Sequence, residues 1–66
     1  MGAEGEEALN RALTTMLNFE ADAVTAMQAY FQEPTLDNHL AAIQARTRAD
    51  TAAIEYARLQ ASRRRV

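Results

Sequence analysis

Apolar residues recur at spacings of three and four through the first half of the chain. Between residues 6 and 32 the large ones fall on one stripe of a helix, at about 100° per residue. The stripe consists of Leu9, Leu13, Met16, Val24, Met27 and Phe31, with Ala12, Ala23 and Tyr30 beside it. Glu6 and Glu7 open the segment, where the helix dipole favours negative charge. The pattern predicts an amphipathic helix over 6–32, preceded by a flexible N-terminus over 1–5.

A break in the pattern follows at Gln32-Glu33-Pro34-Thr35. Pro34 disfavours helical geometry at the residue before it. Thr35 is a good N-cap, and Asp37 stands in the turn behind it, where negative charge suits a helix start. The sequence therefore predicts a turn over 33–35. Because so short a turn leaves no room for another topology, the two flanking helices are expected to be antiparallel neighbours.

The second predicted helix, over 36–63, has apolar residues on two sides. One side is a seam spaced alternately by four and three residues, the period of a coiled coil. The seam consists of Leu36, Leu40, Ile43, Thr47, Asp50, Ile54, Ala57 and Ala61. The opposite side is thinner and consists of Ala41, Ala45, Ala52, Tyr56 and Leu59. Burial on two sides needs more than one neighbour, so we expect an all-α antiparallel hairpin that assembles as a homodimeric four-helix bundle.

Composition agrees with this architecture. The chain has 66 residues, with 15 Ala, 2 Gly, 1 Pro and no Cys. A core this small gains little net stability, and without disulfides self-association is the remaining way to bury more surface. The absence of Cys also excludes thiolate metal sites and a cysteine nucleophile. No apolar run of about 18 residues and no signal peptide stand in the sequence, which predicts a cytoplasmic protein with no membrane partner.

Charge is divided unevenly between the two halves. Residues 1–33 carry six acidic residues and one basic residue, whereas residues 34–66 carry three acidic residues and six Arg. In the hairpin, the acidic start of one helix lies beside the basic end of the other, which favours antiparallel pairing. We therefore expect Glu4, Glu6 and Glu7 to lie near Arg58, Arg63 and Arg64. A basic tail is predicted over 64–66.

Glu20 interrupts the stripe of the first helix. Its predicted neighbours across the hairpin are Thr47, Arg46 and Asp50, which together with Glu20 would form a polar layer. Three interpretations stay open: a layer that fixes register, a rim carboxylate paired with Arg46, or a carboxylate metal site. Four-helix metal sites use Glu-x-x-His, and His39 is outside such a motif. No metal is therefore expected.

Function is predicted to be non-catalytic, because no nucleophile–base pair and no glycine-rich phosphate loop stand out. No enzyme activity and no cofactor are expected. We expect a protein-interaction module that binds itself and another protein. The residues expected to carry self-association are Leu9, Leu13, Met16, Val24, Met27, Leu40, Ile43 and Ile54. The residues expected to contact another protein are Phe19, Tyr56 and Leu59.

Two alternative functions stay open. One is a nucleic-acid-associated protein that uses its Arg-rich second helix and C-terminus, although the isoelectric point near 5.2 is low for that class. The residues concerned are Arg46, Arg48, Arg58, Arg63, Arg64 and Arg65. The other comes from a resemblance. The plan of helix, Gln32-Glu33-Pro34-Thr35-Leu36 turn and helix is similar to that of type III secretion needle subunits and their small chaperones, and to that of phage-encoded inhibitor and adaptor hairpins. This resemblance implies an assembly or chaperone role and assigns no functional residue.

Overall fold

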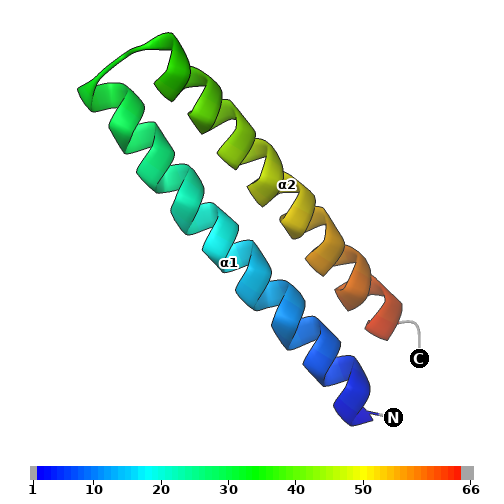
Figure 1. The fold of residues 1–66 in the computed structure, drawn as a ribbon. Coiled ribbons are helices and arrows are strands. Elements are labelled where there is room, and N and C mark those ends of the chain that lie inside the picture. Colours follow the sequence, from blue (N-terminus) through cyan, green and yellow to red (C-terminus); the bar gives the residue numbers. More distant parts are fainter. Residues whose placement is uncertain (1, 65–66) are drawn as a thin grey trace.

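Two long helices make up the protein. The computed structural model describes residues 2–64, and the side chains of residues 5–63. Helix α1 spans Gly2–Gln32 and helix α2 spans Leu36–Arg64. The helices lie side by side and antiparallel, with the turn at one end and both termini at the other (Figure 1). The predicted all-α hairpin is confirmed.

The ends of the helices differ slightly from the predicted ones. Helix α1 begins at Gly2, before the predicted start at residue 6, so part of the segment expected to be flexible is helical. Helix α2 continues to Arg64, one residue into the predicted tail. The remaining tail residues, Arg65 and Val66, lie outside the described residues, as does Met1.

Thr35 and Asn38 hold the turn together. The backbone N–H of Asn38 donates to Thr35 Oγ1 at 3.1 Å, which makes Thr35 the N-cap of α2 as predicted. The side-chain amide of Asn38 donates to the carbonyl oxygen of Glu33 at 2.8 Å and to that of Ala29 at 3.4 Å. Both carbonyls also accept backbone hydrogen bonds, that of Ala29 from the N–H of Glu33 at 2.9 Å and that of Glu33 from the N–H of Thr35 at 2.8 Å. Asn38 therefore joins the start of α2 to the end of α1.

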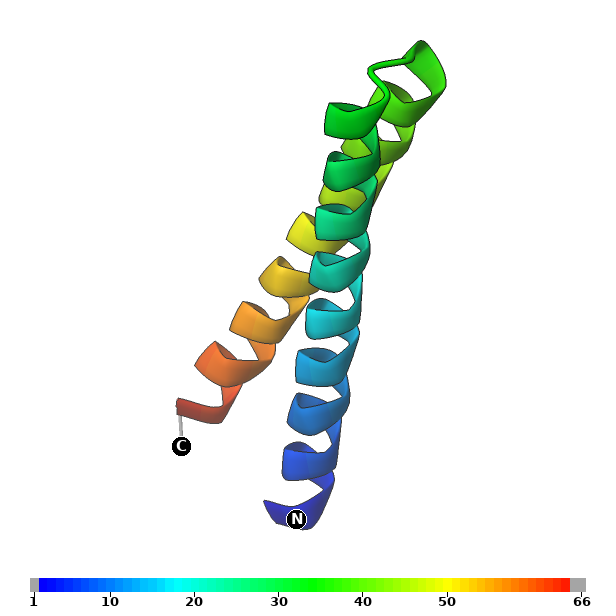
Figure 2. The same cartoon turned by 90° about the vertical axis from the view of Figure 1, so that its left-hand side faces the viewer.

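The contact between the helices is built on alanine. Among the described side chains, those of Ala23, Ala45 and Ala49 are buried, and Phe19 and Ala26 pack against them. Small side chains let helix axes approach to about 8 Å, the short end of the usual range. The axes are nevertheless inclined to each other, as the view along the plane of the hairpin shows (Figure 2).

Helix α2 turns its alanine side, and not its heptad seam, toward α1. Ala45 and Ala49 are buried, whereas all eight seam residues are exposed. Thr47 and Asp50 of the seam were predicted to lie beside Glu20; the structure places Asp50 at an open groove that Glu20 also lines, and Thr47 at the groove on the other side. A seam turned toward α1 would have taken the carboxylates of Glu20 and Asp50 out of water together, which is costly even with Arg46 beside Asp50. With the alanine side inward, both carboxylates remain hydrated.

Charges at the open end of the hairpin lie as expected. Arg63 Nη2 donates to Glu6 Oε1 at 3.0 Å, across nearly the whole length of the sequence. Both side chains are about half exposed or more, so the pair contributes at most about 1 kcal/mol. The prediction that the acidic start of α1 meets the basic end of α2 is confirmed for this pair. The side chains of Glu4 and Arg64 lie outside the described ones.

Candidate interaction surface

Eight exposed residues form a continuous stripe along the side of α2 that faces away from α1. We call it the outer stripe, and it consists of Leu36, Leu40, Ile43, Thr47, Asp50, Ile54, Ala57 and Ala61. Four members are large aliphatic residues that remain between 46% and 71% exposed. Exposed large apolar residues in a row mark an interaction surface more strongly than single ones do.

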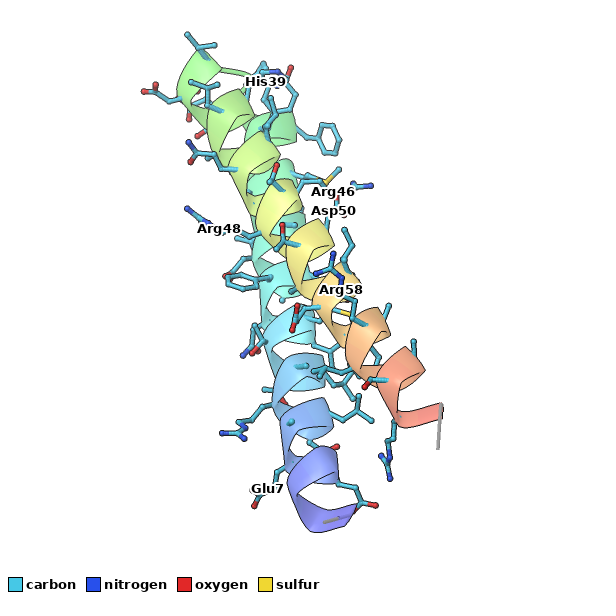
Figure 3. All side chains as sticks on the ribbon, turned by 90° about the vertical axis from the view of Figure 1, so that its right-hand side faces the viewer. Glu7, His39, Arg46, Arg48, Asp50 and Arg58 are labelled. Atoms are coloured by element: carbon cyan, nitrogen blue, oxygen red, sulfur yellow. The ribbon has the colours of Figure 1, made fainter. Side chains whose placement is uncertain are left out.

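Helical geometry places the outer stripe opposite the contact with α1. Thr47 lies midway along the sequence between the buried residues Ala45 and Ala49. Because successive residues turn by about 100°, a residue two positions away points to nearly the opposite side of the helix. Figure 3 shows α2 from this outer side, with α1 behind it. A partner on the outer stripe would therefore contact α2 and leave the hairpin contact intact.

The residues predicted to carry self-association fall into two groups. Leu9, Leu13, Met16 and Met27 are half-buried in the hairpin. Val24, Leu40, Ile43 and Ile54 are exposed, with the last three on the outer stripe. The first group therefore serves the contact between α1 and α2, and the exposed group does not.

The residues expected to contact another protein lie inside the hairpin. Phe19 packs against the alanine core. Tyr56 and Leu59 are half-buried on the inner side of α2, and the hydroxyl oxygen of Tyr56 accepts a hydrogen bond from Gln60 Nε2 at 3.0 Å. All three side chains are partly buried, Phe19 also lines an open groove, and their contact with another protein stays a prediction.

The four residues of the predicted polar layer do not form a buried layer within the hairpin, since all four are exposed. Glu20, Arg46 and Asp50 line one groove, of about 250 Å³, whereas Thr47 lines the groove on the other side. Arg46 Nε lies 3.7 Å from Asp50 Oδ1, so this ion pair runs along α2 and does not reach Glu20. Arg46 and Asp50 point to one side of α2 (Figure 3).

A larger groove, of about 450 Å³, runs along the other side of the hairpin. Its lining comes from both helices and consists of Ala12, Thr15, Phe19, Thr47, Arg48, Thr51, Ala52 and Glu55. Arg48 points to this side, away from Arg46 (Figure 3). The groove is open and combines short polar side chains with one aromatic ring, and no polar side chain that lines it is buried.

The candidate basic patch is only partly described. Arg58 lies on the outward side of α2, and Arg63 is paired with Glu6. Arg64 and Arg65 have no described side chains. Arg46 and Arg48 point to opposite sides of α2 (Figure 3), and the nucleic-acid alternative stays a prediction.

Two kinds of feature, a metal site and a membrane span, are absent from the described part of the chain. Within it, no three His, Asp or Glu side chains gather where they could hold a metal ion. Neither of its helices has a stretch that is long and apolar enough to cross a membrane. As for comparison with known proteins, no family model, curated protein or solved structure matches this chain.

Sequence reasoning missed two structural residues. Asn38 was not singled out, although its position three residues after the N-cap Thr35 is where a polar side chain can reach back across a helix start. Tyr30 was placed on the stripe, but its ring contact with His39, at a centroid distance of 5.1 Å, was not foreseen. Both contacts join residues on opposite sides of Pro34, which a single-helix pattern cannot show.

Proposed function

We propose that this protein is a non-catalytic assembly module that pairs with a second copy of itself through the outer stripe of α2. The observation that carries the proposal is the exposure of Leu36, Leu40, Ile43 and Ile54 on a helix whose inner contact is made largely of alanine. Large aliphatic side chains gain most from burial, at about 25 cal/mol per Å². In a single hairpin these four obtain only part of that gain.

The surface area of the hairpin supports this proposal. The accessible surface is 5286 Å². A compact monomer of 7.3 kDa exposes only roughly 4,200 Å², so this chain exposes roughly 1,100 Å² more. A stable protein interface covers about 800 Å² on each partner. The extra surface of each hairpin is thus large enough for a dimer interface.

The shape of the hairpin leads to the same proposal. The radius of gyration is 15.0 Å, whereas a compact domain of this length has about 11 Å. The hairpin measures 48 × 16 × 12 Å, so it is a thin, elongated body. Two helices alone leave the outer stripe uncovered, and a second copy along α2 would cover it.

Contact with a different protein belongs to the same proposal. Leu17, Val24 and Phe31 of α1 are 53%, 55% and 72% exposed. They belong to the other helix, outside the outer stripe. They are the apolar residues left for a different partner once the outer stripe is covered.

Sedimentation equilibrium tests the proposal. The expected mass is twice the 7.3 kDa of one chain at micromolar concentration. Ile43 is 49% exposed, so its truncation to Ala removes roughly 1 kcal/mol of burial per copy. Two symmetric copies give about 2 kcal/mol, or about a 30-fold rise in the dissociation constant.

Leu17→Ala is the matched control for Ile43→Ala. Leu17 is 53% exposed but belongs to α1, so its truncation should leave the dissociation constant unchanged. A mass of one chain at every concentration would refute the proposal. An equal effect of the two substitutions would show that the outer stripe is not the contact.

A further inference from the structure

We infer that the second copy docks on the outer stripe in antiparallel orientation, with Thr47 of each copy facing Asp50 of the other. This inference rests on the proposed function and adds its geometry and register. Dimers of this kind have two-fold symmetry, in which the same surface of both copies meets itself. The stripe must therefore be complementary to its own reverse.

The outer stripe has this property. When one copy is reversed, each Leu meets an Ala, each Ile meets an Ile, and the two polar residues meet each other. The four layers, each present twice, pair Leu36 with Ala61, Leu40 with Ala57, Ile43 with Ile54, and Thr47 with Asp50 of the second copy. Large residues opposite small ones fill the space between helices evenly. The central layer is polar, and the layers beyond it are apolar.

The charges beside the stripe are complementary in the same register. Asp37 and Arg58 each follow a stripe residue directly, at the position that meets its equivalent in an antiparallel pair of helices. Asp37 of one copy then lies beside Arg58 of the second copy, and symmetry repeats this pair. Arg58 points outward from α2, on the side away from α1 (Figure 3).

A parallel arrangement lacks these features. In register, every stripe residue would meet its own equivalent, so the Asp50 carboxylates of the two copies would face each other. Like charges in a desolvated contact are strongly unfavourable. The antiparallel arrangement instead gives each Asp50 a hydroxyl neighbour while keeping the Arg46 guanidinium 3.7 Å away in its own helix.

The resulting dimer differs from a square bundle. Because the outer stripe and the α1 contact lie on opposite sides of α2, the second copy adds beyond α2 and not beside both helices. The four helices then form one layer, with the two α2 helices in the middle and the α1 helices outside. Each α2 is covered on both of its apolar sides.

Disulfide exchange between single-cysteine variants tests the orientation, since the natural chain has no Cys. Ile43→Cys is labelled with ¹⁵N, mixed with unlabelled Ile54→Cys, and equilibrated in a glutathione redox buffer. Mass spectrometry separates the two same-variant dimers from the mixed dimer. The antiparallel register places the thiol introduced at position 43 opposite the one introduced at position 54. Nearly all cross-linked dimers should therefore be mixed, whereas random pairing would give about half mixed dimers. A parallel register gives same-variant dimers only.

Asn18→Cys, on an exposed position of α1, replaces Ile43→Cys as the control and should give no excess of mixed dimer. Circular dichroism confirms that each variant remains helical. Sedimentation of the natural chain tests self-association separately from the antiparallel register. A dimer with same-variant cross-links, or with none, overturns the antiparallel stripe contact and leaves self-association in place. A monomer overturns both.

Discussion

Ala49 is the residue at which the close approach of the two helices can be tested most directly. It is 4% exposed, and it forms the buried cluster with Ala23 and Ala45. Ala49→Leu adds three carbon atoms where two helices meet through alanine. The space can come only from moving the helices apart, which also loosens the contacts of Phe19.

Overpacking of this kind costs about 1–3 kcal/mol. A chain of 66 residues has a total stability of roughly 3–10 kcal/mol at usual values per residue. The substitution therefore removes a large part of it, and the midpoint of thermal unfolding should fall by about 5–20 °C. Circular dichroism at 222 nm measures this midpoint.

Ala41→Leu is the matched control for Ala49→Leu, because it makes the same chemical change on the same helix at an exposed position. Its midpoint should stay within about 4 °C of that of the natural chain, as surface substitutions usually change stability by less than about 0.5 kcal/mol. Both variants are compared at one concentration, so that self-association affects them equally. An Ala49→Leu midpoint equal to that of Ala41→Leu would refute the alanine contact.

Three further predictions concern the turn, the polar layer and the coupling of folding to assembly. Asn38→Ala removes the hydrogen bonds to Glu33 and Ala29 and should lower the free energy of unfolding by about 1 kcal/mol. Asn18→Ala is the control and should not lower it. Equal urea midpoints for the two variants would contradict the bridging role of Asn38. The double substitution Thr47→Leu with Asp50→Leu should lower the dissociation constant of the proposed dimer at least tenfold in sedimentation, because a polar layer costs affinity. The same layer fixes orientation, so cross-linking of the double variant should lose its preference for mixed dimers. If the preference is retained, the polar layer is not what orients the helices. The unfolding midpoint of the natural chain should rise with protein concentration, since assembly stabilises the folded state by mass action; a constant midpoint from about 1 to 100 μM would argue against coupling.

The helices and the turn could be predicted because their signals are local. Pro34 disfavours helix at the residue before it, and Thr35 offers a hydroxyl to the N–H of Asn38, whatever the rest of the chain does. The apolar period depends only on the geometry of one helix. Such signals survive in any tertiary arrangement, which is why the predicted turn over 33–35 agrees with the helix bounds of the structure.

The side of α2 that packs against α1 could not be predicted from the period of its apolar residues alone. The period shows that apolar residues line two sides of this helix, but it does not say which side meets which neighbour. Residue size suggests that Leu40, Ile43 and Ile54 should be buried first. The structure buries Ala45 and Ala49 instead, because fit and charge decide the contact with α1. A ranking of residues by hydrophobicity contains neither the fit between the helices nor the charge of the groups that would be buried.

The same reasoning explains the fate of the candidate polar layer. Glu20 and Asp50 were expected together on the assumption that the heptad seam faced α1. Once the alanine side turns inward, Glu20, Arg46 and Asp50 line an open groove between the helices, and Thr47 lines the groove on the other side. Prediction of a site between two helices therefore depends on the helix rotation, which is the quantity that local patterns leave undetermined.

The two apolar sides of α2 contribute differently to the fold: one determines its geometry and the other has the larger surface to bury. The alanine side fixes how α1 and α2 lie, because close backbone approach tolerates little change in side-chain volume. It contributes little burial, since alanine has little surface to bury. The outer stripe has the larger side chains and lacks a partner among the described residues of the chain. In the proposed dimer, the alanine side of α2 specifies the hairpin and the outer stripe stabilises it, so that folding and assembly are coupled.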